Sequence, residues 1–194
     1  MTSSPSLADL KETLRQQALA RRDGIGRDVR ANASHLICER TLSLPELARS
    51  GPVGCYWPIR SEVDPRALIE GLVARGQDVA LSRIIHPHLS FRLWRPGDPL
   101  VKSGFGVREP GPDAPEVFPK ALLVPLAAFD RAGGRIGYGK GHFDRAIATL
   151  EKHHPVLTIG LAYADQEIER VPVESHDRRL DLIVTETELI RANP

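Results

Sequence analysis

A run of glycines and basic residues at positions 133–145 has the composition of a phosphate-binding loop. It reads Gly-Gly-Arg-Ile-Gly-Tyr-Gly-Lys-Gly-His-Phe-Asp-Arg, after an apolar run at 121–126 that predicts a buried strand and before residues 146–150, which predict a helix. Glycines let the backbone approach phosphate oxygens, and the free N–H groups of a helix N-terminus attract anions. Its cations strengthen this attraction: Arg135, Lys140 and Arg145. The segment therefore predicts a nucleoside triphosphate site.

The spacing of this loop departs from both common nucleotide-binding patterns. Gly134 to Lys140 nearly meets the pattern G-x-x-x-x-G-K-[ST], but Gly141 stands where Ser or Thr would contact magnesium. In the dinucleotide pattern G-x-G-x-x-G, Gly137 and Gly139 fit but the third glycine comes one residue too early. Asp144 offers a replacement magnesium contact, because this ion prefers oxygen ligands. The alternative interpretation is a flexible loop with a basic, solvated face.

The elements that must position the loop alternate between helices and strands. Alternation of this kind predicts an α/β fold, a three-layer αβα sandwich with a mainly parallel sheet flanked by helices. Residues 104–119 are rich in glycine and proline and predict an irregular surface excursion. Helices are expected at about 7–22, 28–42, 65–75 and 146–153, and strands at 52–57, 79–81, 89–94, 121–126, 156–161 and 182–185.

The carboxyl ends of the strands are the expected place for a ligand. In open α/β sheets ligands bind in the crevice outside those ends. That rule groups residues 57–62 after the first strand, Ser82 and Arg83 after the second, and the glycine-rich loop after the 121–126 strand. We therefore expect these three segments to lie together.

Length, charge and cysteine usage limit the class of protein. The 194 residues carry a formal net charge of +1 and are 41% hydrophobic, which predicts a single domain spanning 1–194. The balanced charge argues against nucleic acid or membrane partners, and acidic residues interrupt the arginines at 21–30. No signal-type segment or apolar run long enough to span a bilayer is apparent. Cys38 and Cys55 have no metal-binding spacing, and we expect a cytoplasmic monomer with reduced cysteines.

A set of short motifs extends from residue 11 to residue 185. The motifs are Lys11–Arg15, Tyr56–Asp64, Phe91–Asp98, Phe105–Pro110, Leu123–Asp130, the glycine-rich loop through Arg145, and Asp181–Thr185. Each is weak alone, but in this order they resemble the 5-formyltetrahydrofolate cyclo-ligase family, whose members are also called methenyltetrahydrofolate synthetases. The resemblance implies conversion of 5-formyltetrahydrofolate and ATP to 5,10-methenyltetrahydrofolate, ADP and phosphate, with Mg²⁺. It implies phosphorylation of the formyl oxygen and ring closure by N10 of the folate.

The resemblance also implies roles for individual residues. Lys11 and Arg15 would contact ATP phosphates from the first helix rather than form a solvated basic stripe. The loop would wrap the triphosphate with Arg135, Ile136, Gly137, Tyr138, Gly139, Lys140, Gly141, His142 and Phe143. Arg135 and Lys140 would be the catalytic cations. Asp144 and Asp181 would bind magnesium; the alternatives are a helix N-terminal carboxylate for Asp144 and a turn residue for Asp181.

Glu62 and Trp57 are the residues that the resemblance places against the folate. Glu62, the third catalytic residue, would accept hydrogen bonds from substrate N–H groups or position N10. Trp57 would supply an aromatic wall, and its alternative role is a core aromatic at a strand end. The chain departs from the family where His142 and Phe143 replace a tyrosine pair, and where Ser82 replaces a proline.

Other functions remain compatible with these residues. A ligase that uses ATP on another N-formyl or carboxyl substrate would keep the glycine-rich loop. A regulator that binds a nucleotide or a folate without turnover would keep the pocket but form no product. RNA binding ranks last, because no aromatic-rich binding strand accompanies the arginines.

Overall fold

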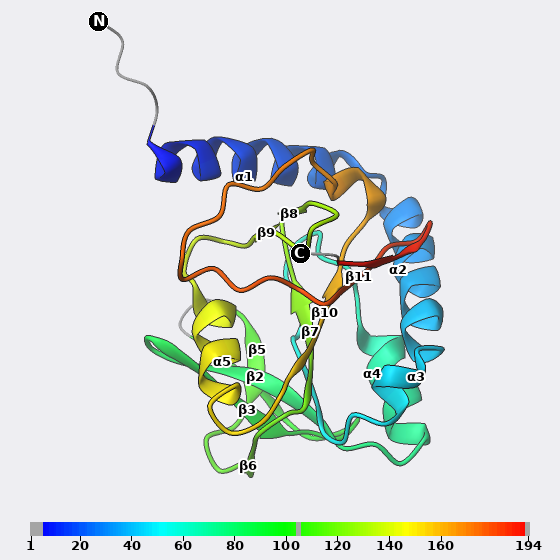
Figure 1. Ribbon diagram of the computed structural model, residues 1–194. Helices are drawn as coiled ribbons and strands as arrows, with labels where there is room; N and C mark the ends of the chain where they lie inside the picture. The colour runs from blue at the N-terminus through cyan, green and yellow to red at the C-terminus, as the bar shows by residue number, and fades with distance from the viewer. Residues whose placement is uncertain (1–5, 104–105, 193–194) are drawn as a thin grey trace, which may run out of the picture.

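The computed structural model describes residues 6–103 and 106–192, and its elements alternate as the sequence predicts (Figure 1). The helices are α1 (Leu7–Gly24), α2 (Arg27–Leu42), α3 (Pro45–Ala48), α4 (Arg66–Ala74) and α5 (His142–Leu150), with a 3-10 helix at Ala164–Gln166. The strands are β1 (Val53–Cys55), β2 (Val79–Ile85), β3 (His88–Leu93), β4 (Leu100–Lys102), β5 (Arg108–Pro110), β6 (Glu116–Val117), β7 (Ala121–Pro125), β8 (Ala128–Phe129), β9 (Arg135–Ile136), β10 (Leu157–Leu161), β11 (Leu182–Val184) and β12 (Leu189–Arg191).

An eight-stranded sheet in the order β12-β11-β10-β7-β1-β2-β3-β6 forms the centre of the fold. Its central strands, from β11 to β2 in this order, run parallel, whereas the strands at both edges pair antiparallel. In β1, Val53 pairs with Val79 of β2 on one side and with Ala121 of β7 on the other. Such strands are short apolar runs because both of their faces are covered. The predicted mainly parallel sheet is confirmed.

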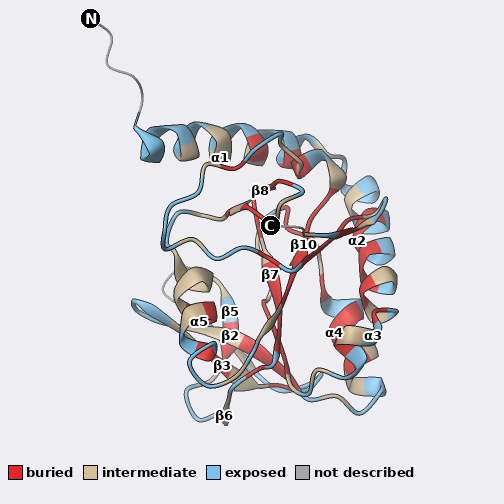
Figure 2. Cartoon of the chain, viewed as in Figure 1, coloured by how far each residue is buried: buried red, intermediate tan, exposed pale blue. Residues whose placement is uncertain are grey.

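Alternate residues of the central strands contribute to two separate cores. Leu123 of β7 packs with residues of α2, α3 and α4 on one face of the sheet. Leu122 and Val124 pack with Ile147 of α5 on the other face. Figure 2 shows buried residues along the strands and on the inward sides of these helices. The expected three-layer αβα sandwich is therefore confirmed.

Helix α1 lies across one end of this sandwich (Figure 1). A capping box starts it, because the Ser6 hydroxyl accepts the Asp9 N–H at 3.2 Å and the Asp9 carboxylate accepts the Ser6 N–H at 3.2 Å. Ala18 packs in a small third cluster with Ile136 of β9 and Val171. The helix is thereby fixed against the base of the glycine-rich loop. None of the described helices is long and apolar enough to cross a membrane.

Three stretches, 100–117, 128–136 and 189–191, contain strands that the sequence did not predict. The excursion at 104–119 was expected to be irregular, but β5 pairs with β4 and β6 pairs with β3, so the expectation was wrong there. Residues 104–105 lie outside the described residues. The hairpin of β8 and β9 also stands between β7 and the rest of the glycine-rich loop. Strands of two or three residues are too short to show a periodic pattern in the sequence.

Candidate active site

The carboxylate of Asp130 fixes the start of the glycine-rich loop. Its Oδ1 accepts the N–H groups of Ala132 at 3.0 Å and Gly134 at 2.9 Å, and its Oδ2 accepts the Val171 N–H at 2.8 Å. A Cβ atom at Gly134 would lie 2.8 Å from Oδ2, so only glycine fits beside this carboxylate. The turn of the β8–β9 hairpin is thus held by a side chain that is 5% exposed.

Arg15 of α1 supports the middle of the loop. Its Nε donates to the Gly137 carbonyl at 2.7 Å, and Glu12 pairs with the same guanidinium. Gly139 has a φ of +83°, and a Cβ atom there would lie 3.1 Å from the guanidinium carbon of Arg15. The loop needs glycine at 139 both for its left-handed backbone and for this close approach. The structure therefore brings Arg15 and the glycine-rich loop together, and the predicted contact of Arg15 with ATP phosphates stays a prediction.

Lys11 lies one turn earlier on α1 but contacts a different segment. Its Nζ pairs with Glu174 at 2.7 Å and with Asp177 at 2.5 Å. Burial disfavours the charged amine, but the two carboxylates outweigh burial and raise the pKa of Lys11. Lys11 thus stays charged and joins α1 to the segment before β11.

Arg135 and Asp144 form an ion pair beside that same segment. Nη2 of Arg135 lies 2.8 Å from Oδ1 of Asp144, which also accepts the Arg178 N–H at 3.0 Å. The Arg135 side chain is 5% exposed, and burial lowers its pKa against the attraction of Asp144 and Asp177. The carboxylates of Asp144 and Asp177 therefore both attract the guanidinium of Arg135.

No hydrogen bond among the described residues joins Asp181 to Arg135 or Asp144. The Oδ2 of Asp181 accepts the backbone N–H of Thr158 at 2.7 Å and the Thr158 hydroxyl at 2.8 Å. These contacts join the start of β11 to β10. Asp181 therefore precedes its strand, whereas Glu62 follows the carboxyl end of the parallel strand β1. The geometry agrees with the alternative role of Asp181, a residue that holds the start of a strand.

Glu62 is a buried carboxylate in the turn after β1. Glu62 is 8% exposed, and its Oε2 accepts the Ile59 N–H at 2.9 Å. Burial raises the pKa of Glu62 to about 7, although Arg22, Arg60 and the Tyr138 hydroxyl act to lower it. Such a carboxylate can accept or release a proton near neutral pH. Arg60, in the same turn, has the left-handed φ of +53°, which is rare for a residue with a side chain.

Arg22 connects this turn to the glycine-rich loop. The residue is 1% exposed, and its guanidinium donates to the Ser61 hydroxyl at 2.9 Å and the Tyr138 hydroxyl at 2.7 Å. A guanidinium only donates, so the Tyr138 oxygen accepts. Arg22 therefore joins Ser61, the neighbour of Glu62 in the chain, to Tyr138 of the glycine-rich loop.

Trp57 packs against Trp94. The two ring centroids are 5.7 Å apart with an interplanar angle of 68°. The guanidinium of Arg66 lies 5.9 Å from the Trp57 ring. Trp57 is partly buried against the larger core, which agrees with its alternative role as a core aromatic, and its predicted role against the folate stays a prediction.

The two residues that replace a tyrosine pair have different environments. Phe143 packs against both cores of the sandwich. Burial lowers the pKa of His142, and the charges of Arg145, His86 and Lys140 lower it further. His142 is therefore a neutral imidazole at neutral pH, available as a hydrogen-bonding group.

Sequence reasoning missed Arg22 and Asp177. A signal for Arg22 was present, because Lys11, Arg15 and Arg22 are spaced by four and by seven residues and so lie on one face of α1. Asp177 had no such signal, since its contact with Lys11 joins residues 166 positions apart in the chain.

The fold is that of an α/β protein, and its candidate site joins a basic glycine-rich loop to a buried carboxylate at the carboxyl edge of the sheet. The sequence profile of the 5-formyltetrahydrofolate cyclo-ligase family matches residues 8–186. The chain therefore belongs to the 5-formyltetrahydrofolate cyclo-ligase family, and the resemblance seen in its motifs is confirmed.

Individual relatives agree with this assignment. The 5-formyltetrahydrofolate cyclo-ligase of Haemophilus influenzae is 30% identical over 175 residues, covering 81% of this chain and 92% of that protein. The Escherichia coli 5-formyltetrahydrofolate cyclo-ligase is 31% identical over 158 residues, covering 77% and 86%. The solved structure of Aquifex aeolicus 5,10-methenyltetrahydrofolate synthetase has a TM-score of 0.82 at 31% identity, covering 95% of this chain and 94% of that one.

The raised pKa of Glu62 predicts a pH-dependent stability. The pKa is about 7 in the folded protein against an ordinary 4.5, so the unfolded chain ionises first as pH rises. Stability from this group is therefore lost between those two values, by about 3 kcal/mol in all. Glu62→Gln should remove this loss. The free energy of unfolding of the variant, measured in urea, should therefore rise relative to that of the wild type between pH 5 and pH 8. Glu169→Gln, at an exposed carboxylate, is the control; an equal slope in all three proteins would contradict the burial effect.

Proposed function

We propose that this chain converts 5-formyltetrahydrofolate and ATP to 5,10-methenyltetrahydrofolate, ADP and phosphate, with Mg²⁺. The observation that carries the proposal is the pair of hydrogen bonds from Arg22 to Ser61, which precedes the buried Glu62, and to Tyr138 of the basic glycine-rich loop. One group suits a folate nitrogen and the other suits a polyphosphate, so the two substrates would meet at Tyr138. Family membership supports the same reaction.

The loop has the donors that a triphosphate needs. Phosphoryl transfer depends mostly on positioning and on neutralising charge over the transferred group. Lys140 is exposed at the loop tip, and the backbone from Gly137 to Gly141 contains two left-handed glycines that leave N–H groups open to a ligand. Arg15 holds this backbone through its hydrogen bond to the Gly137 carbonyl. We assign ATP binding to this loop together with Lys11 and Arg15.

The proposed reaction balances with the residues of this site. The formyl oxygen attacks the γ-phosphorus of ATP, and ADP leaves with the electrons of the broken P–O bond. N10 then attacks the formyl carbon, its proton passes to an acceptor, and phosphate leaves as the methenyl C=N bond forms. Glu62 is the acceptor that we assign to the N10 proton, because its pKa of about 7 suits proton uptake near neutral pH.

Asp144 and Asp177 are the carboxylates that fit a magnesium ion. Both act on the guanidinium of Arg135, and Asp177 directly precedes Arg178, whose N–H binds Asp144. Magnesium prefers carboxylate and phosphate oxygens and would neutralise phosphate charge when bound. We propose this pair in place of Asp144 with Asp181, because both contacts of the Asp181 Oδ2 are made to Thr158.

We also propose that the protein acts as a monomer in the cytoplasm. Every residue assigned to the site comes from one chain. Cys38 and Cys55 are buried free thiols, which are typical of a reducing compartment.

The direct test mixes the purified protein with 5-formyltetrahydrofolate and Mg-ATP and follows the near-ultraviolet absorbance of the methenyl product. Product that requires both ATP and magnesium is the expected result. If no product forms while ATP still binds, the substrate is another N-formyl or carboxyl compound, or the protein is a regulator.

The rate of the reaction should rise with pH as Glu62 ionises. We expect kcat/KM for the folate to increase through a midpoint near 7, the pKa of Glu62. Arg22→Met should move this midpoint to higher pH, because the charge of Arg22 lowers that pKa. Arg21→Met removes a neighbouring exposed cation and should leave the midpoint in place. If the midpoint does not move in Arg22→Met, the charge of Arg22 does not affect the pKa of Glu62.

Lys140→Ala should weaken ATP use with little effect on the folate. Removing one charge-assisted contact to a phosphate costs roughly 1.5–3 kcal/mol, which is a rise of about tenfold or more in the KM for ATP. Steady-state kinetics with each substrate varied in turn measures both constants. Lys102→Ala, at an exposed lysine of β4, is the matched control. Equal ATP constants in the two variants would remove Lys140 from the phosphate site.

Three aspartates can be separated by a magnesium titration. Asp144→Asn and Asp177→Asn should each raise the magnesium concentration needed for half-maximal rate, about tenfold for a lost carboxylate ligand. Asp181→Asn should leave that concentration unchanged but lower the unfolding free energy, since its hydrogen bonds to Thr158 weaken. A shift in Asp181→Asn with none in Asp177→Asn would restore the pair predicted from the sequence.

A further inference from the structure

Arg60, in the turn after β1, has a backbone conformation that favours glycine. Its φ is +53°, and it is the only residue other than glycine with a positive φ among the described residues, since the seven others are glycines. A side chain in this region costs free energy, whereas glycine adopts it freely. Glycine at position 60 would remove this cost. Strain of this kind gathers at functional sites, so it points to a use for the Arg60 side chain.

Hydrogen bonds on both sides of the strained residue hold the turn in place. The Ile59 N–H donates to Glu62 Oε2 at 2.9 Å, and the Glu62 N–H donates to the Ile59 carbonyl at 3.1 Å. The Ser61 hydroxyl accepts from Arg22 at 2.9 Å and donates to Asp23. Both partners of Ser61 belong to α1. The turn therefore keeps its shape through contacts that do not involve the side chain of the strained residue.

The Arg60 guanidinium lies at the junction of the two segments that we assign to different substrates. Its Cζ is 6.0 Å from the centroid of the Tyr138 ring, which belongs to the glycine-rich loop, and Arg60 stands two residues before the buried Glu62. Burial raises the pKa values of Glu62 and Tyr138, and the charge of Arg60 opposes both rises. The guanidinium thus acts on the turn and on the loop at once. Beside an aromatic ring it still keeps its N–H donors for an anion.

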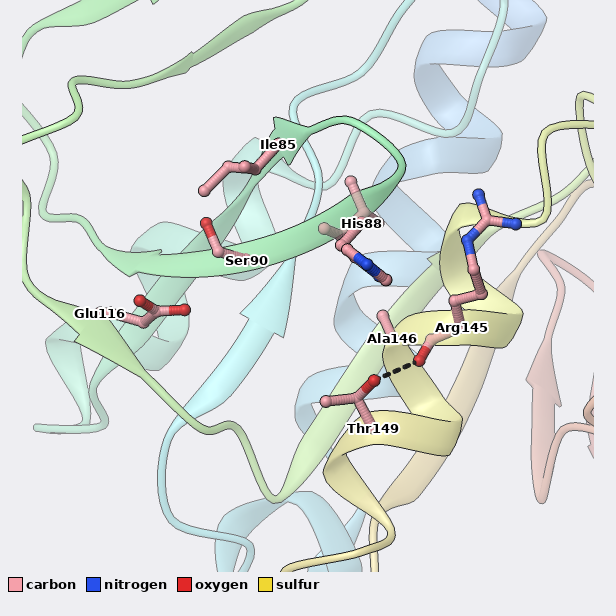
Figure 3. Close-up of a pocket in the computed structure, with 8 residues that line it drawn as sticks. Ile85, His88, Ser90, Glu116, Arg145, Ala146 and Thr149 are labelled. Carbon is pink, nitrogen blue, oxygen red and sulfur yellow. Dashed lines mark hydrogen bonds between the residues drawn. The ribbon is translucent and has the colours of Figure 1, made fainter.

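The cations of the turn and the loop differ in whether they have partners. Arg135 pairs with a carboxylate, and Arg145 donates to two backbone carbonyls. Figure 3 shows Arg145 on α5 beside a hollow of about 310 Å³ between this helix and the β2–β3 hairpin. Among the described residues of these two segments, the side chains of Lys140 and Arg60 are the cations without a hydrogen bond or an ion pair. Since we assign Lys140 to ATP, Arg60 is the remaining donor.

The group that moves between the two substrates is anionic and would pass this junction. In the proposed reaction a lone pair of the formyl oxygen forms a bond to the γ-phosphorus, the bond from that phosphorus to the bridging oxygen breaks, and ADP keeps the electron pair. Donors already in position stabilise the charge on the transferred oxygens. Resting on the proposed function, we propose that Arg60 is a catalytic residue that binds the γ-phosphoryl group during its transfer to the formyl oxygen. Arg60 neither gains nor loses a proton in this step.

The test compares Arg60→Gly with the wild type in the formation of methenyl product from Mg-ATP and the monoglutamate form of 5-formyltetrahydrofolate. The loss of one donor to the group in transfer should lower kcat about a hundredfold. Both KM values should change little, because the contact is made in the transition state. Glycine adopts the left-handed backbone without strain, so the Tm should not fall. Arg60→Lys keeps a charge without the planar fork and should recover part of the rate.

A rapid-quench single turnover shows which chemical step has slowed. ADP formation in Arg60→Gly should slow together with product formation, because the proposed contact is made in phosphoryl transfer. ADP formed at the wild-type rate, followed by slow product, would place the loss in ring closure and overturn the role of Arg60.

Arg95→Gly makes the same exchange at an exposed arginine in the turn after β3. Because β3 runs antiparallel to β2, this turn lies at the opposite edge of the sheet, and the variant should keep the wild-type kcat. Product from the wild type with an unchanged kcat in Arg60→Gly would overturn the role of Arg60 and leave the reaction standing. A loss confined to the KM for ATP would also overturn it, since Arg60 would then bind ATP only in the ground state. No product from the wild type would overturn the proposed function and the role of Arg60 together.

Discussion

The buried guanidinium of Arg22 is the interaction on which the arrangement of the site depends. A charge removed from water is costly unless hydrogen bonds satisfy it. Arg22 is 1% exposed, and its direct partners are the Ser61 hydroxyl, the Tyr138 hydroxyl and the Leu126 carbonyl, none of which is charged. These partners come from the turn after β1, the glycine-rich loop and the end of β7. A cation retained there holds three loops in one relative position.

The parallel sheet explains why those loops meet at all. Because β1 and β7 are adjacent and parallel, the segments that follow them emerge at the same edge. Helix α1 lies across that end, and its basic face presents Arg15 to the glycine-rich loop and Arg22 to Glu62's turn. Lys11, on the same face, reaches the segment before β11. One helix therefore contacts the glycine-rich loop, the turn of Glu62 and the segment before β11.

Local pattern made much of this architecture predictable. The apolar run of β7 and the helix expected at about 7–22 depend on neighbouring residues, and the sequence therefore indicated both correctly. The glycines of the loop could be recognised for the same reason. The strands β5, β6 and β9 could not, because their pairing partners decide them and the strands have only two or three residues. Likewise Asp181 was predicted as a magnesium ligand and Asp177 was not singled out, since the sequence does not show which carboxylates turn toward Arg135.

The acidic residues of the site explain why a metal ion and a polyphosphate would bind together. Lys11 is already paired with Glu174 and Asp177, and Arg135 is paired with Asp144. A polyphosphate alone would have to share these cations with carboxylates that repel it. A divalent cation between the carboxylates and the phosphates changes that balance, because each anion then has a positive partner. On the proposed function, this compensation ties magnesium to ATP binding as well as to the chemical step, and it requires the carboxylates to remain ionised beside their guanidinium and amine partners.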